Sequence, residues 1–570
     1  MLRPLLLAIA FVALLPFTLL RAGFAALRRR RIVLEVVLEG RHLLRPMPTS
    51  PFSRRQSGIS RRSLAWALRE AGRDPAVQTI WLRIGHLTGG YGELNALREA
   101  VRRVRASGRR VVASLGHADT RSLYVASAAD EILVSPHVTV DAAGMSLELT
   151  FFGEALGKIG VGLDVITAGA YKSAMESFTR DAPSEASAEA VDALLTSLYD
   201  TVVSALASRP GPGGAPRDPA AVRAALESGP MLAPDALKCG LVDALTEEEG
   251  VPVALDCHPK GKSARVRVES YSGPSRPWPK FRFRRPRLAV VEIHGNITDG
   301  RLDDAEPTAG ANAAAVCQAL ERAQKDRRVR GVLLHVDSRG GSATASERMW
   351  RGVRALAASK PVIACMGDYA ASGGYYVASA AHGIVAAPGT LTGSIGVIAA
   401  KPVAAGLFER LGIHHTRFER GENSSLFSLA RRFTDSQRVR VEQSVRHFYT
   451  LFLGRVAEGR GKTPADIAPV AEGRVWTGVQ ARERGLIDRL GDEQAAIEWL
   501  SEKTGVDATP GLLVIGPRVP FARRMMPKLF GAQLARLQDA DGPVGEALAL
   551  LQLADNAEGV IAYSPLRLRR

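Results

Sequence analysis

The sequence predicts an α/β protein with two tandem domains, each built on a parallel sheet covered by helices, behind an N-terminal transmembrane helix. Three observations predict it: an apolar run at the start of the chain, an alternation of apolar strands with amphipathic helices, and a repeat of that alternation after roughly 250 residues. The length of 570 residues suits two or three domains.

The first element is the apolar run from Pro4 to Leu20, which residues 22–27 extend if Arg21 snorkels to the interface. We interpret residues 1–27 as an uncleaved membrane anchor. A cleaved signal peptide is the alternative, although the run is longer than the usual apolar core of such peptides. The arginines at 28–31 follow the helix, so the positive-inside rule alone would keep the large domains in the cytoplasm.

The next elements occur twice in the same order: apolar strand, amphipathic helix, apolar strand, small-residue helix and short strand. Continuous apolar strands that alternate with helices predict parallel sheets buried on both faces. The matching segments are 79–84, 93–106, 108–116 and 122–136 in the first half, and 331–336, 345–358, 359–367 and 374–388 in the second.

These repeats set the predicted domain boundaries. We expect a first α/β domain at 32–258 and a second at 288–505. Residues 259–287 are rich in Pro, Gly, Ser and Arg and are interpreted as a basic linker. Residues 506–570 depart from the repeat and form a C-terminal extension whose role the sequence does not indicate.

The formal charge of +17 raises the possibility of a nucleic-acid partner. The excess lies in Arg28 to Arg31, in the linker and in the C-terminal tail, and it is not interleaved with aromatic residues. An anionic membrane surface therefore fits better than nucleic acid. The four cysteines are scattered without a CxxC pair, so we predict no metal site.

The halves differ most where the second reads DYAASGGYYVASAA. Ser372 stands at the start of a predicted helix, followed by Gly373 and Gly374. Small neighbours let a substrate backbone come close, and the helix N-terminus offers N–H groups to a developing oxyanion. The first half has HADTRSLYVASAA at the matching place and lacks the two glycines. The alternative interpretation is a serine that only caps the helix.

A second loop, HVDSRGGSATASE at 335–347, joins a strand to a helix. The backbone N–H groups of Gly340 and Gly341 are candidates for an oxyanion hole. A tight turn with Thr344 or Ser346 as the helix cap explains the same pattern. The segment GTLTGSIGV at 389–397 is rich in small residues and can border the site.

A serine nucleophile needs a base, because its hydroxyl is weakly nucleophilic at its ordinary pKa. The histidines of the second half do not fall in a recognisable triad context. Lysine can serve if desolvation lowers its pKa towards neutrality. Lys172, in TAGAYKSAMESFTRD, has small neighbours that suit a dry setting, although a solvated surface lysine is the alternative.

Together, the segments GDYAASGGYYVASAA, DSRGGSATASE, GTLTGSIGV and AGAYKSAMESFTRD resemble the signal peptide peptidase A family, of the long, two-domain protease IV type. The resemblance runs from the anchor to about residue 500. It implies two ClpP/crotonase-like α/β domains and a Ser–Lys dyad formed between the halves. It makes Ser372 the nucleophile, Lys172 the general base and Ser394 the hydroxyl that orients the lysine, with Gly340, Gly341 and Gly373 at the oxyanion hole.

The resemblance also implies a membrane-bound serine endopeptidase that degrades signal peptide remnants and other apolar peptides. Acyl transfer to a serine needs no organic cofactor, so we expect none. It implies a homotetramer and a single-pass location in the bacterial inner membrane with periplasmic catalytic domains, against the pull of Arg28 to Arg31. Arg339 departs from the family pattern, which usually has proline before the two glycines. Two alternatives remain: a crotonase-like acyl-CoA enzyme and a non-catalytic membrane scaffold.

Overall fold

A computed structural model describes residues 31–41, 59–210, 215–258, 261–273, 286–300, 310–508, 511–516 and, as backbone, 560–563. The described residues divide into two compact units. Unit one comprises the residues up to Gly89, Glu93–Met145 and Tyr199–Arg284. Unit two comprises Gly90–Gly92, Ser146–Leu198 and the residues from Arg285 onward.

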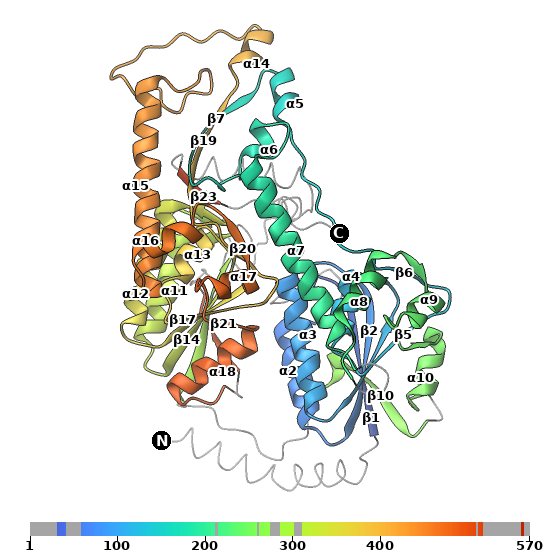
Figure 1. Ribbon diagram of the computed structural model, residues 1–570. Coiled ribbons are helices and arrows are strands. Elements are labelled where there is room, and N and C mark those ends of the chain that lie inside the picture. Colours follow the sequence, from blue (N-terminus) through green and yellow to red (C-terminus); the bar gives the residue numbers. More distant parts are fainter. Residues whose placement is uncertain are drawn as a thin grey trace. The chain divides into compact units, whose positions relative to one another are not determined.

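Unit one is built on a parallel sheet in the order β10-β1-β2-β3-β5-β9 (Figure 1). A smaller sheet has the order β4-β6-β8. The strands are β1 (Arg31–Gly40), β2 (Val77–Leu87), β3 (Arg110–Leu115), β4 (Ala118–Asp119), β5 (Glu131–Val134), β6 (Thr139–Asp141), β8 (Met231–Leu232), β9 (Ala244–Leu245) and β10 (Ser263–Arg267). The helices are α2 (Arg61–Arg73), α3 (Tyr91–Ala106), α4 (Thr120–Ala126), α8 (Pro219–Glu227), α9 (Ala233–Lys238) and α10 (Val251–Ala254).

Unit two repeats this plan with the order β20-β18-β16-β14-β11-β22, in which β17 pairs with β16. Its strands are β11 (Arg287–His294), β14 (Val329–Ser338), β16 (Val362–Ala371), β17 (Gly383–Ala386), β18 (Leu391–Gly393), β20 (Val475–Thr477), β21 (Arg489–Leu490) and β22 (Leu513–Val514). Its helices are α5 (Gly153–Lys158), α6 (Glu176–Thr179), α11 (Ala313–Lys325), α12 (Ala343–Ala357), α13 (Gly373–Ala378), α14 (Ala405–Arg410), α15 (Asp435–Arg460), α16 (Pro464–Ile467), α17 (Gly478–Glu483) and α18 (Glu493–Thr504).

A second sheet of unit two has the order β13-β12-β15-β23-β19-β7. Its strands are β7 (Gly162–Ala168), β12 (Ile297–Thr298), β13 (Ala311–Asn312), β15 (Gly340–Ser342), β19 (Val397–Val403) and β23 (Val560–Tyr563). β7 and β19 pair antiparallel along their full lengths, from Gly162 opposite Val403 to Ala168 opposite Val397. This ladder brings a segment of the first repeat into the unit of the second.

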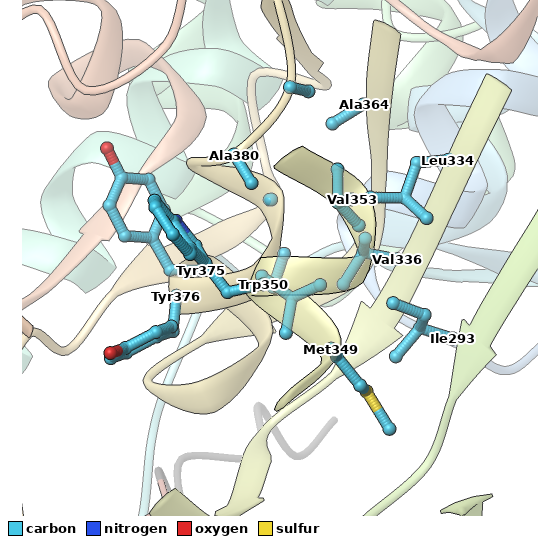
Figure 2. Close-up of a cluster of buried hydrophobic side chains, with 14 of the residues drawn as sticks. Ile293, Leu334, Val336, Met349, Trp350, Val353, Ala364, Tyr375, Tyr376 and Ala380 are labelled. Atoms are coloured by element: carbon cyan, nitrogen blue, oxygen red, sulfur yellow. The ribbon is translucent and has the colours of Figure 1, made fainter. Parts of the chain in front are cut away.

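The core of unit two explains why the apolar strand segments are continuous. Figure 2 shows side chains from β11, β14 and β16 meeting those of α12 and α13 in one cluster. Leu334 and Val336 of β14 and Tyr375 of α13 are fully buried. Burial of apolar area at about 25 cal/mol per Å² makes this cluster a major stabilising contribution, and it fixes the strand ends that carry the site.

The two repeats follow the same element order and the same spacing along the chain, as the sequence predicts. The strands β2, β3, β5 and β6 begin at residues 77, 110, 131 and 139, and their counterparts β14, β16, β17 and β18 begin at 329, 362, 383 and 391, so the same interval separates each pair. By that interval, Thr120 at the start of α4 takes the position of Ser372. The predicted class of two tandem α/β domains with parallel sheets is confirmed.

The structure draws the domain boundary differently from the predicted range 32–258. Residues 146–198 of that range, which include Lys172, pack with unit two. The reason is the β7–β19 ladder, which joins residues far apart in the chain. The division falls inside α7 (Glu185–Ala207), between Leu198 and Tyr199.

The predicted anchor at residues 1–27 lies outside the described residues. Within the described part of the chain, α7 is the helix with the length and apolar composition of a membrane span. Half of its most apolar stretch is buried inside the protein, and the buried helix of a soluble protein has the same character. The composition of α7 therefore does not assign it to a membrane.

Candidate active site

Ser372 lies at the turn between β16 and α13, and its side chain is fully buried. Its backbone has φ 53°, a left-handed conformation that is strained for any residue with a Cβ. Its N–H donates to the carbonyl oxygen of Gly393 at 2.8 Å, which holds the turn against β18. The strained turn presents the Ser372 hydroxyl at the carboxyl end of a central strand, where parallel sheets place their reactive groups.

The two glycines after Ser372 are required by packing. A side-chain carbon on Gly374 would lie 2.6 Å from the carbonyl oxygen of Ser338, and one on Gly373 would lie 3.2 Å from the Cα of Gly340. The sequence interpretation assigned these glycines to close approach by a substrate. The structure adds a packing reason, because these glycines let the loop after β14 lie directly against the start of α13.

Lys172 follows β7 in a short turn and is 4 % exposed. Its Nζ donates to Ser372 Oγ at 2.8 Å, to the carbonyl oxygen of Ser394 at 3.0 Å and to Ser394 Oγ at 3.0 Å. An ammonium group has three N–H donors, so these three acceptors satisfy it completely. All three residues belong to unit two.

Burial lowers the pKa of Lys172 to about 7, because desolvation disfavours the charged ammonium. A carboxylate close by would oppose this shift, and none contributes to it. Near neutral pH, a substantial fraction of Lys172 is therefore an uncharged amine that can accept a proton. A solvated surface lysine, the alternative left open by the sequence, is excluded by the burial.

The loop at Glu472 and Gly473 holds the lysine turn in place. The N–H of Tyr171 donates to the carbonyl oxygen of Glu472 at 2.8 Å, and the N–H of Ala170 donates to the Glu472 carboxylate at 3.0 Å. A side-chain carbon on Gly473 would lie 2.7 Å from Cβ of Lys172, so only glycine fits there. This loop was missed by the sequence analysis, since AEGRVW carries no recognisable motif.

Backbone strain gathers around the lysine. Among the described residues, positive φ at a non-glycine occurs at Asp256, Ser372, Ser394 and Glu472, and the last three surround Lys172. Each such residue costs of order 1–3 kcal/mol and persists only where its surroundings fix it. Because such strain clusters at functional sites, it makes this region a candidate site independently of any motif.

The oxyanion candidates are not equivalent. The N–H of Gly340 donates to Ser338 Oγ at 3.1 Å, so it is already engaged. Gly341 lies beside the start of α13, since a side-chain carbon on Gly373 would be 3.3 Å from its nitrogen. Gly373 is the first residue of α13, where the backbone N–H has no acceptor within the helix. As donors to an oxyanion, the N–H groups of Gly341 and Gly373 are therefore better candidates than the N–H group of Gly340.

Arg339, which departs from the family pattern, does not extend into solvent. Its side chain is 8 % exposed, and its guanidinium lies over the ring of Tyr369 at 4.4 Å. The N–H of Tyr369 donates to the Asp337 carboxylate at 3.1 Å. Arg339 therefore braces the loop against β16, the strand that precedes Ser372.

The structure thus brings Ser372, Lys172 and Ser394 into direct contact, with Gly341 and Gly373 adjacent. A buried serine on a strained turn, hydrogen-bonded to a desolvated amine, has the chemistry that nucleophilic catalysis with an adjacent base requires.

Comparisons with known proteins define the class further. The model of peptidase family S49 matches residues 103–256 and 354–507. The chain is 29% identical over 80% of its length to a chloroplast serine protease SPPA of Arabidopsis thaliana, covering 67% of that protein. It is 31% identical over 76% of its length to Protease 4 of Salmonella typhi, covering 71% of that protein. A solved ClpP1 mutant from Listeria monocytogenes aligns with 36% of this chain and 94% of its own at 14% identity, with a TM-score of 0.23.

The protein is a serine peptidase. It belongs to peptidase family S49, whose model matches both repeats. The resemblance to signal peptide peptidase A and protease IV is confirmed, and the two alternatives, an acyl-CoA enzyme and a non-catalytic scaffold, are set aside.

Proposed function

We propose that the peptidase acts through a Ser–Lys dyad in which Ser372 is the nucleophile and Lys172 is the general base. The observation that carries the proposal is the hydrogen bond of 2.8 Å between Lys172 Nζ and Ser372 Oγ, two side chains that are both buried. When Lys172 is neutral, its two N–H groups donate to the oxygen atoms of Ser394 and its lone pair accepts the Ser372 proton. Ser394 thereby orients the base.

The reaction follows from these positions. Ser372 Oγ attacks the peptide carbonyl carbon as its proton passes to Lys172, and the N–H groups of Gly341 and Gly373 stabilise the oxyanion. Lys172 then protonates the leaving amine as the C–N bond breaks. Water, deprotonated by Lys172, attacks the acyl ester, and the ester oxygen recovers the proton as the acid product leaves.

We propose that the substrate binds as an extended strand between β15 and β19. Support comes from β23, which pairs antiparallel with Gly340–Ser342 and with Ile398 and Ala399. An extended segment of the chain itself therefore satisfies the backbone groups beside Ser372, as a bound peptide would. The sequence of β23, Val-Ile-Ala-Tyr, is apolar and agrees with apolar peptides, including signal peptide remnants, as substrates.

The same proposal includes a membrane location with a single anchor, periplasmic catalytic units and a homotetrameric assembly. Support for assembly comes from exposed apolar side chains between α14 and α15, which fit contact with a second copy of the chain. They are Leu411, Ile413, Phe418, Phe427 and Leu429, and Phe418 is 92% exposed. Light scattering on the wild type and on Phe418→Glu checks this, since a change of assembly state is expected only if these side chains pack against another copy.

The dyad is tested by labelling and turnover. Purified enzyme treated with a fluorophosphonate should be modified at Ser372, and Ser372→Ala should abolish both labelling and peptide hydrolysis. Substantial hydrolysis by Ser372→Ala or by Lys172→Ala would rule out the dyad.

A further inference from the structure

Unit one carries a second group of reactive side chains, at chain positions that match the active site of unit two. His86 lies near the end of β2, His117 follows β3, and Asp119 caps α4. Thr120, the next residue, takes the position of Ser372. The carboxyl ends of parallel strands gather functional side chains, and here they gather two imidazoles and a carboxylate instead of a nucleophile.

The three side chains converge on one point. Asp119 Oδ2 lies 3.8 Å from His86 Nδ1 and 3.7 Å from His117 Nε2, and the three candidate ligand atoms all lie within 4.8 Å of one another. The imidazole rings meet edge to face with centroids 5.1 Å apart. Ligand atoms around a tetrahedral zinc ion lie about 3.3 Å apart, so small rotations of these partly exposed side chains complete a coordination geometry.

The carboxylate is already oriented for this purpose. Asp119 Oδ1 accepts the N–H and the hydroxyl of Ser122, each at 2.7 Å. These two bonds fix the carboxylate and leave Oδ2 directed at the histidines, an arrangement common for carboxylates that bind metal ions. Asp141 lies opposite Asp119 in the β4–β6 register and adds negative charge close by.

We propose that His86, His117 and Asp119 form a binding site for a divalent transition-metal ion of the zinc class. Two imidazoles and one carboxylate suit zinc and its neighbours, whereas magnesium and calcium prefer ligand sets made of oxygen atoms. Three protein ligands leave a position for water. The sequence analysis predicted no metal site because it followed the cysteines, and His86 and His117 stand on separate strand ends with no motif between them.

The test uses the untagged full-length protein, because a polyhistidine tag would bind the same ions. After treatment with a chelator, the protein is titrated with Zn²⁺ by calorimetry and its metal content is measured after dialysis. We expect about one zinc ion per chain, no comparable binding of Mg²⁺, and absorption bands of a tetrahedral site with Co²⁺. His86→Gln and His117→Gln should each weaken zinc binding by about tenfold or more.

The matched control is His137→Gln, an exposed histidine of the same unit that pairs with Glu247. It should bind zinc as the wild type does. The proposal is overturned if the wild type binds no zinc, or if both His86→Gln and His117→Gln retain wild-type affinity. Circular dichroism on each variant separates lost ligation from lost folding, and Asp119→Asn is avoided because Asp119 also caps α4.

Discussion

The two repeats share one architecture and differ in what stands at the ends of their strands. Unit two has Ser372 followed by two glycines, and the loop after β14 lies against them. Unit one has Thr120 followed by Arg121 and Ser122 at the same interval, and two histidines with an aspartate beside them. The sheets tolerate either set, so the chemistry depends on a few residues at the strand ends and not on the fold.

The comparison also shows that the repeats do not divide the chain equally. β7 comes from the first repeat and β19 from the second, yet both lie in unit two, where they pair with each other. Lys172 lies in the turn that follows β7, so it belongs to unit two as well. Unit two therefore contains both members of the proposed dyad, and unit one contains neither.

The largest expected effect comes from removal of either member of the proposed dyad, which unit one does not contain. Ser372→Ala and Lys172→Met should each lower kcat/KM for a peptide substrate by about 10³-fold or more, because nucleophile and base act as a unit. Thr120→Val, at the equivalent position of unit one, should leave kcat/KM unchanged. Steady-state hydrolysis of a fluorogenic peptide measures both. Equal losses in Thr120→Val and Ser372→Ala would mean that the units do not differ in the proposed way.

A smaller loss is expected from Gly473→Ala, which places a carbon against Cβ of Lys172. This carbon should displace Lys172 by up to about an ångström, and such a displacement of the base should lower kcat by about 10²-fold. Gly412→Ala is the matched control, since Gly412 also has positive φ but has open space around it. Wild-type turnover by Gly473→Ala would show that the loop does not position the lysine.

Ser394→Ala should reduce kcat by about tenfold, because Lys172 loses one of its hydrogen-bond acceptors. That acceptor stabilises the charged amine more than the neutral one, so its removal should also move the acid limb of the pH–rate profile to lower pH. The control is Ser379→Ala, which removes a buried serine hydroxyl of unit two outside the site. A tenfold loss without any change of profile would point to a structural role only.

The pH dependence of kcat/KM tests whether Lys172 of unit two is the base. With the pKa of Lys172 lowered to about 7, kcat/KM should rise through pH 7 and level off above it, as the neutral base accumulates. An enzyme whose rate is flat from pH 5 to 9 would not use this amine as its base.

The smallest expected effect concerns stability. Between pH 7 and the ordinary lysine pKa, the unfolded chain binds a proton at Lys172 that the folded chain does not, so this residue makes stability rise with pH. The slope is up to about 1.4 kcal/mol per pH unit. The melting temperature of Lys172→Met, relative to wild type, should therefore fall by several degrees from pH 7 to pH 9. A constant difference would contradict the lowered pKa.

Much of this architecture could be predicted from the sequence, because continuous apolar strands and a long repeat are local signals. Ser372, Lys172 and Ser394 were found through motifs, although nothing local placed Lys172 in unit two. That placement depends on pairing between β7 and β19, which are distant in the chain. The roles of Glu472 and Gly473 and the convergence of His86 with His117 are also products of tertiary structure, and no spacing in the sequence reveals them.

The ladder between β7 and β19 has a consequence for the history and engineering of this enzyme. Exchange of the second segment alone would set a foreign strand in place of β19 against the resident β7, and the position of Lys172 relative to Ser372 depends on that pairing. Recombination within the family should therefore keep both segments together, and a chimaera should be active only when residues 146–198 come from a parent whose strand still matches β19.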